Sequence, residues 1–396
     1  MLNRRTLRIK AMQAIYAYKQ AEGSDYLLAL DQIGEDFAPD LMSMEVQDRK
    51  LLEGKKQISQ LLFKEWYETK QFETEEADKE ILNAVNRAIV TYQNQVKKDY
   101  KYYGNQMLGA VDRIYDHYLA SLQILEVLVS LIEDEEVKKE KRFTAASGPD
   151  VKQFLNNRVV QKLLGNKSYQ ENIIRRNISW GSDISAIRQA YKNILKQDPE
   201  FLSYLSIPVP TLEQDFEVVK HIFKNIIFKE KNLQSLFEEQ DLNWVENKAI
   251  VKSLVNKTIK MFGEEPQDSE AGSNDIALLD LSANWEDDRA FFEELYYQTL
   301  QDDEKYETMV ATSVKNWDVE RVALLDKIIL KMALCEMHIF RSIPVKVTIN
   351  EYIEISKLYS TPKSKQFING VLDKMAQDLT NKGEIRKSGR GLIDNK

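Results

Sequence analysis

Apolar residues recur every three or four positions along most of this chain, which is the spacing of one face of an α-helix. The pattern is clearest between residues 319 and 379, where three apolar stripes are separated by breaks at Pro344 and Pro362. Because proline lacks a backbone N–H and restricts the residue before it, each break predicts a helix boundary. We therefore expect a compact unit of three helices near the C-terminus.

The same periodicity predicts helices in the rest of the chain. A first helix is expected over residues 3–20, and others over 25–37, 47–66, 75–103, 107–132 and 154–164. The 396 residues include only 14 glycines and 8 prolines, which disfavours a protein rich in strands and turns. These observations predict an all-α protein with enough apolar residues for more than one core.

Residues 215–260 resemble residues 288–333 at a constant offset of 73 positions. Asn243 and Trp244 fall on Asn316 and Trp317 (317 − 244 = 73), and Asp215 falls on Asp288. We interpret this agreement as a repeated helical hairpin; the alternative is an accidental match between amphipathic helices. Trp244 and Trp317 are then expected near the start of equivalent helices.

Composition and charge exclude several classes of function for this chain. The net charge of −8 argues against general coating of nucleic acid, so any RNA site must be a local basic patch. One cysteine, Cys335, predicts no disulfide framework, and no apolar run reaches transmembrane length. The N-terminus lacks the apolar core of a signal peptide, so we expect a cytoplasmic protein.

No catalytic or metal-binding pattern stands out in the sequence. His117, His221 and His338 are each isolated from other metal-ligand residues, and no glycine-rich phosphate loop is present. Acidic pairs occur only on charged helix faces, and Cys335 lies in an apolar helix, which is typical of a structural thiol. We expect no enzyme activity, no metal and no cofactor.

Cations are concentrated at the start of the first helix. Arg4, Arg5, Arg8 and Lys10 precede the first acidic residue, Glu22. A helix N-terminus already carries partial positive charge, so each exposed cation there costs roughly a few tenths of a kcal/mol. The cluster indicates either a site for an anion or a solvated basic end, and charge alone does not separate the two. All three arginines are expected off the apolar face of the helix.

Two motifs resemble a known family. Pro344 and Val345-Lys346-Val347 precede Ile349-Asn350-Glu351, and Phe367-Ile368-Asn369-Gly370-Val371-Leu372 follows a serine-containing loop. Together with the arginine-rich start, which continues into Ala11, Gln13, Ile15 and Tyr16, these segments resemble the NusB family. The resemblance implies an all-α, NusB-like helical bundle. It also implies recognition of single-stranded boxA-like RNA with NusE, a ribosomal protein of the small subunit, in the RNA polymerase antitermination complex.

The resemblance also implies which residues contact RNA. Arginines of the first helix would bind phosphates, Gln13 would read a base edge, and lysines of the C-terminal unit would extend the basic surface. The full candidate set is Arg4, Arg5, Arg8, Lys10, Gln13, Lys346, Lys363 and Lys365. The alternative is a non-catalytic protein-interaction scaffold that has kept the fold and lost RNA binding.

The chain departs from the family in its length, with a large helical insertion after the first helix. We expect a basic first helix (1–22), an inserted helical region (23–262) with the repeated hairpin (about 198–262), an acidic linker (263–287), a NusB-like domain (288–380) and a disordered basic tail (381–396). The mixed lysine and tyrosine run at 97–103 is more typical of a helix end than of an RNA site. Gly370, inside a predicted helix, is expected where another helix packs closely.

Overall fold

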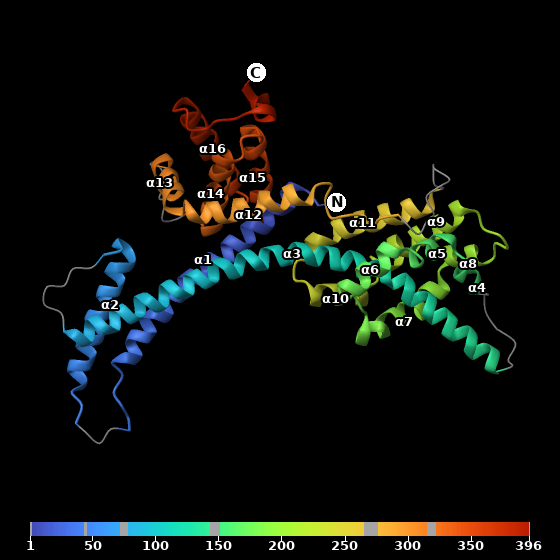
Figure 1. Cartoon of the computed structure of the whole chain (residues 1–396), viewed down its shortest axis with the longest axis horizontal. Helices are drawn as coiled ribbons and strands as arrows, with labels where there is room; N and C mark the ends of the chain where they lie inside the picture. Colours follow the sequence, from blue (N-terminus) through green and yellow to red (C-terminus); the bar gives the residue numbers. More distant parts are fainter. Residues whose placement is uncertain are drawn as a thin grey trace. The chain divides into compact units, whose positions relative to one another are not determined.

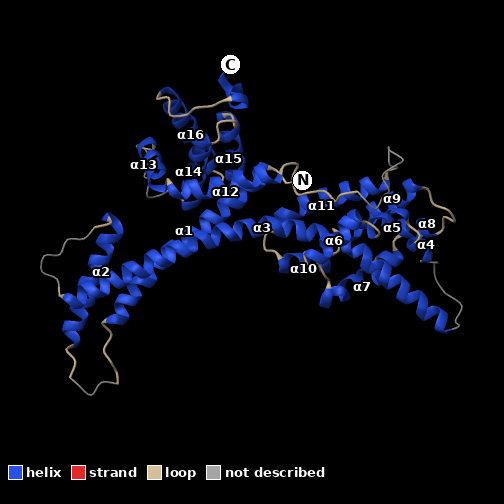
Figure 2. Cartoon of the chain, viewed as in Figure 1, coloured by secondary structure: helices blue, strands red, loops and turns tan. Residues whose placement is uncertain are grey.

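The computed structural model describes residues 2–42, 46–71, 78–142, 151–264, 276–314 and 322–395. Figure 2 shows helices joined by loops and no strand over these residues. The predicted all-α fold is therefore confirmed. None of the described helices is long and apolar enough to cross a membrane. The chain divides into two compact units, one formed by residues 1–3 and 109–287 and the other by residues 4–108 and 288–396.

The second unit joins the N-terminal helices to the C-terminal ones (Figure 1). Its elements are α1 (Arg4–Asp36), α2 (Arg49–Thr69), residues 79–108 of α3 (Lys79–Arg142), α12 (Trp285–Gln301), α13 (Asp303–Ser313), α14 (Leu324–Ile339), α15 (Val345–Tyr359), α16 (Ser364–Asn381) and the 3-10 helix η6 (Gly389–Asn395). The three-helix unit predicted near the C-terminus corresponds to α14, α15 and α16, and Pro344 is the residue that caps α15.

Helix α14 is the central element of this bundle. Every residue from Ile328 to Met337 is buried, and α14 packs against α1, α13, α15 and α16. A helix that is buried on all sides needs neighbouring helices around its whole circumference. Helix α1 is one of these neighbours, although it lies at the other end of the sequence. Asp326 on α14 accepts hydrogen bonds from Ser360 and Ser364, which fixes the turn between α15 and α16.

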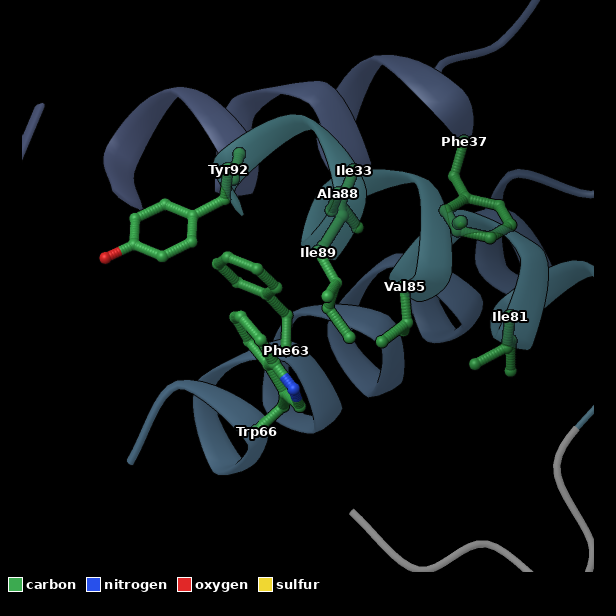
Figure 3. Packing of buried hydrophobic residues seen from close by; sticks show 11 residues of the cluster. Ile33, Phe37, Phe63, Trp66, Ile81, Val85, Ala88, Ile89 and Tyr92 are labelled. Atoms are coloured by element: carbon green, nitrogen blue, oxygen red, sulfur yellow. The ribbon is translucent and has the colours of Figure 1, made fainter. Parts of the chain in front are cut away.

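A second core lies where the end of α1 packs with α2 and the beginning of α3. Figure 3 shows Phe63 and Trp66 of α2 facing Tyr92 and Ile89 of α3. Phe63 is fully buried, and its ring stacks on that of Trp66 with 5.8 Å between centroids. Burying a side chain of this size contributes about 1.5–3 kcal/mol, so this cluster accounts for the stability of the inserted α2–α3 hairpin.

The first unit contains the remaining helices. They are residues 109–142 of α3, α4 (Lys152–Leu155), α5 (Arg158–Leu164), α6 (Lys167–Arg175), η1 (Gly181–Asp183), α7 (Ile184–Asn193), η2 (Leu195–Gln197), α8 (Pro199–Leu205), α9 (Leu212–His221), the π-helical turn η3 (Ile222–Ile227), α10 (Lys231–Gln240) and α11 (Trp244–Gly263). Helices α5, α9 and α11 all pack against one another. The prediction that this large part of the chain is helical is thus confirmed over the described residues.

Helix bounds in the two units agree with the predicted repeat. Helix α12 begins 73 residues after α9 (285 − 212), and α13 begins 72 residues after α10 (303 − 231). Buried positions also correspond at the offset of 73: Val218 with Phe291, Val219 with Phe292, Ile222 with Leu295, Phe223 with Tyr296, Leu233 with Tyr306, Phe237 with Val310, and Val255 with Ile328.

The two aspartates that correspond at this offset each pair with an arginine that begins another helix. Asp215 pairs with Arg158, the first residue of α5, with 2.7 Å from Nε to Oδ2. Asp288, which is 73 positions further on, pairs with Arg4, the first residue of α1, at 3.5 Å. Trp244 begins α11 as expected, whereas Trp317 lies outside the described residues. These coincidences support our interpretation of a repeated hairpin.

Two expected helix boundaries are absent. The helices expected at 3–20 and 25–37 form one helix, α1, which passes through Gly23. Those expected at 75–103 and 107–132 are likewise joined in α3, which passes through Gly104. An interior glycine costs about 1 kcal/mol relative to alanine, and the buried residues on both sides, such as Tyr18 and Ile33, outweigh that cost.

The C-terminal tail is also ordered, contrary to the expected disorder. Residues 389–395 form η6, and the backbone N–H of Ser388 donates to the carbonyl of Arg341 over 3.0 Å. Within the expected acidic linker, residues 265–275 lie outside the described residues, as does the loop at 147–149. The part of the linker that follows is packed, because Leu278 and Leu281 are buried.

The expected close approach at Gly370 is wrong, because a Cβ built there meets no atom within 4 Å. We predict that Gly370→Ala stabilises the protein by about 1 kcal/mol, the gain in helix propensity. Gly104→Ala is the matched comparison, since its Cβ would lie 2.9 Å from Cζ of Tyr297 and 3.2 Å from Cε1 of buried Tyr296. That variant should lose about 1–3 kcal/mol through overpacking. Thermal melts giving the reverse order would contradict both assignments.

A second prediction concerns Asp25 on α1, which is 6% exposed. Burial, together with the neighbouring Asp99 and Glu22, raises the pKa of Asp25 from 3.8 to about 6. The folded state therefore holds this proton more tightly than the unfolded chain, so stability is highest below the unfolded pKa and falls as the pH rises through 6.

Replacing Asp25 with asparagine removes this penalty. We expect Asp25→Asn to gain about 1–3 kcal/mol at about pH 7.5 and to leave stability nearly unchanged near pH 4. Asp31→Asn, at an exposed position on the same helix, is the control and should change little at either pH. Equal effects of the two variants in urea titrations would show that Asp25 carries no special penalty.

Candidate nucleic-acid interface

The predicted arginines lie at the start of α1, and they differ sharply in exposure. The side chains of Arg4 and Arg5 are 43% and 42% exposed, whereas that of Arg8 is 3% exposed. The first turn of α1 contains no acidic residue. The expectation that all three arginines lie off the buried face is therefore wrong for Arg8, and the exposed cations of this turn are Arg4 and Arg5.

Arg8 forms a buried, two-pronged ion pair with Glu336 of α14. Its Nε and Nη2 donate to the two carboxylate oxygens over 2.7 and 2.8 Å. Glu336 is fully buried and also accepts hydrogen bonds from the hydroxyls of Thr348 (2.9 Å) and Tyr352 (3.2 Å). Burial alone would lower the pKa of Arg8, but the hydrogen bonds to Glu336 raise it, so the guanidinium stays charged. This network joins α1, α14 and α15.

Arg5 is held by Glu351 on α15. Two hydrogen bonds of 2.8 Å join its Nε and Nη2 to the carboxylate, and Nη1 of Arg8 approaches the same group at 3.5 Å. The bond from Arg5 lowers the pKa of Glu351 below its usual value, so the carboxylate is ionised at neutral pH. Arg5 consequently presents only part of its guanidinium to an incoming anion.

Arg4 makes the weakest contacts of the three arginines. Its distance to Asp288 is 3.5 Å, which is long for a hydrogen bond, and its guanidinium lies 4.9 Å from the centre of the Phe291 ring. The guanidinium thus lies over an aromatic ring, and the side chain of Arg4 remains 43% exposed. Arg4 is therefore the cation of this turn best placed to bind a phosphate.

The other predicted residues differ in exposure and in their position on the helices. Lys10 is buried at 2% exposure, and Gln13 is half-buried. Lys346 is exposed in the first turn of α15, while Lys363 and Lys365 are exposed beyond its opposite end. At 1.5 Å per residue, the two ends of this helix are separated by roughly 20 Å, so a single short ligand does not reach all three lysines.

Metal chemistry finds no support among the described side chains. No group of three or more His, Cys, Asp or Glu residues there is placed to hold a metal ion. His221 contacts Asp198 and Glu200, and Cys335 is buried, where burial raises the pKa of its thiol to about 12.

Comparison with known proteins identifies the family of this chain. Residues 248–377 match the model of the NusB family. A transcription antitermination protein NusB from Bacillus licheniformis is 41% identical over 90 residues, which cover 70% of that protein and 23% of this chain. The chain belongs to the NusB family.

Two other relatives carry the same name. The NusB of Salinibacter ruber is 42% identical over 105 residues, and that of Chloroherpeton thalassium is 40% identical over 104 residues. The matches cover 66% and 49% of those two proteins and 26% of this chain. No solved structure matches the chain significantly.

The range that matches the NusB family contains the carboxylates but not the arginines. Glu336 and Glu351 lie within residues 248–377, whereas α1 lies outside them. Sequence reasoning missed the role of both carboxylates. A signal for Glu336 was present, since it is the only acidic residue between 327 and 350 and follows the apolar run 332–335. Glu351 belongs to the Ile349-Asn350-Glu351 motif that carried the resemblance.

We predict that Arg8 acts as a structural residue. Arg8→Met should destabilise the protein by about 3–5 kcal/mol, because it leaves the buried carboxylate of Glu336 without its cation. Adding Glu336→Gln should recover a large part of the loss, since the amide is neutral. Thr348 and Tyr352 donate to different carboxylate oxygens, so the one amide oxygen keeps one of these two hydrogen bonds. Arg4→Met is the control and should change unfolding free energy in urea by less than about 1 kcal/mol. A similar small loss for Arg8→Met would refute the assignment.

Proposed function

We propose that this protein is a NusB-type transcription antitermination factor that binds single-stranded boxA-like RNA of nascent ribosomal transcripts. The observation that carries the proposal is the pair of half-exposed arginines, Arg4 and Arg5, at the start of α1. Family membership and the names of the relatives support the same role.

The chemistry of this turn suits an RNA backbone. Arginine binds phosphate through parallel N–H groups, and its flat face stacks on unpaired bases. Arg4 keeps most of its donors open, while Arg5 offers those that Glu351 does not occupy. The N-terminus of α1 adds partial positive charge, and no acidic side chain lies in its first turn.

The proposed partners follow from the family. We propose that the RNA is bound together with NusE, within the RNA polymerase antitermination complex, in the cytoplasm and without a catalytic step. The packed α14–α16 bundle would provide the NusE surface. The exposed lysines Lys346, Lys363 and Lys365 remain candidates for additional contacts with RNA.

One observation favours the alternative of a protein-interaction scaffold. Arg8 and Lys10 are buried, and Arg5 is paired with Glu351, so four predicted cations supply fewer open charges than the sequence suggests. A scaffold would keep these pairs for stability and would need no RNA. The two functions differ in their response to the loss of Arg4 and Arg5.

We predict that Arg4→Ala combined with Arg5→Ala weakens RNA binding and leaves the fold intact. For single strands, the slope of log affinity against log salt falls by about 0.7 for each lost phosphate contact, so two lost contacts should flatten it by roughly 1.4. Fluorescence anisotropy with a labelled boxA-like RNA over a series of salt concentrations measures this slope, with and without NusE.

The matched control is Arg49→Ala with Lys50→Ala, which removes two exposed cations from α2. Its affinity and slope should stay close to those of the unchanged protein. If both double variants lose affinity equally, the protein responds only to bulk charge. If the unchanged protein does not bind this RNA at all, with NusE present, the scaffold function replaces the proposal.

A further inference from the structure

The C-terminal tail folds back onto the turn between α14 and α15. Beyond α16, Gly383 adopts φ +71 and Ile385 is buried. The ammonium of Lys387 donates to the carbonyl of Phe340 over 3.0 Å, and the backbone N–H of Ser388 donates to that of Arg341 over 3.0 Å. The tail is thus attached to this turn by its backbone as well as by a side chain.

Glycines make this attachment specific. A Cβ built on Gly391 would overlap the backbone carbonyl oxygen of Arg341, and Gly389 has φ +55, a left-handed conformation that side chains disfavour. Backbone cannot move aside as the end of a flexible side chain can. Any larger residue at position 391 must therefore push η6 away from the turn.

Docking brings several cations together at the surface. Arg386 and Arg390 of the tail are exposed, as are Arg341 of the turn and Lys346 of α15. No ion pair joins any of these three arginines to a described carboxylate, in contrast with Arg5 and Arg8. Concentrating unneutralised cations costs free energy through mutual repulsion, which an anionic ligand would remove.

Aromatic contacts connect this cluster to the start of α1. The centroids of the Phe340 and Phe291 rings are 4.8 Å apart. The guanidinium carbon of Arg4 lies 4.9 Å from the centroid of Phe291. Arg341 is the residue directly after Phe340. The contacts through Phe291 and Phe340 therefore connect Arg4 to the turn on which the tail is docked.

We propose that the docked tail and the α14–α15 turn form a second RNA-binding surface, made of Arg341, Arg386 and Arg390, that extends the site at Arg4 and Arg5. The ligand is the phosphate backbone of single-stranded RNA flanking the segment held at α1. An extended polyanion fits a row of open arginines, and its contacts need no base sequence. The proposal rests on the proposed function.

The experiment separates charge from placement. One variant removes charge: Arg341→Ala, Arg386→Ala and Arg390→Ala together. The other, Gly391→Val, keeps every charge and displaces the tail. Anisotropy is measured against a short boxA-like RNA and against the same RNA extended by polyuridine at either end. Circular dichroism and thermal melts show that the bundle stays folded. If Gly391→Val does not fold, Gly389→Val replaces it, because it also keeps every charge and cannot easily adopt the φ of +55 at that position.

We expect both variants to bind the short RNA like the unchanged protein and to lose affinity for one extended RNA. The charge variant should flatten the salt slope by roughly 2, for three lost contacts. Gly391→Val should act in the same direction, and its residues 385–393 should exchange amide hydrogens faster. Arg4→Ala with Arg5→Ala should weaken binding of both RNAs.

Each other outcome overturns the inference in a distinct way. If the charge variant loses affinity and Gly391→Val does not, the tail is a tethered polycation and not a placed surface. If neither loses affinity while the Arg4 and Arg5 variant does, the proposed function stands and the second surface does not exist. If the unchanged protein binds neither RNA, the proposed function itself fails and the inference fails with it.

Discussion

The ion pair between Arg8 and Glu336 is the contact on which the second unit depends. It is buried on both sides, and its carboxylate also satisfies Thr348 and Tyr352, so that α1, α14 and α15 meet at one group. Removing either charge would leave the other stranded in an apolar interior. A pair of this kind contributes less through net attraction than through specificity, because only one placement of α1 satisfies it. The orientation of Arg4 and Arg5 follows from that placement.

This constraint explains where sequence reasoning succeeded. Apolar periodicity and proline breaks predicted α14, α15 and α16, because these helices bury one face or more and their boundaries follow from backbone chemistry. Sequence reasoning failed at Gly23 and Gly104. The free-energy cost of a glycine inside a helix favours a break there, but packing of the residues on both sides favours one continuous helix. Propensity is a local quantity, and the burial of distant residues overrides it.

The candidate site shows a different limit. Residue types in the first turn of α1 indicate positive charge, but they do not say which cations face solvent. Arg8 and Arg4 are the same residue type in the sequence. Their exposure differs because Arg8 pairs with buried Glu336 and Arg4 with Asp288, and both of these carboxylates are far away in the sequence. The ordered tail was missed for a related reason. The glycines of the tail, considered alone, predicted disorder. In the structure, Gly391 permits a close backbone contact with Arg341.

The distribution of paired and open arginines has a consequence for affinity. Glu351 and Asp288 lie beside the cations that would meet RNA, and each partly neutralises its neighbour. An RNA phosphate must then compete with a carboxylate already in place, which lowers the gain from each contact. The arginines of the docked tail face no such competition from described side chains. A protein with a net charge of −8 therefore gains most from concentrating its unpaired cations in one place. In this fold, that place is where α1 and η6 both pack on the helix pair α14–α15.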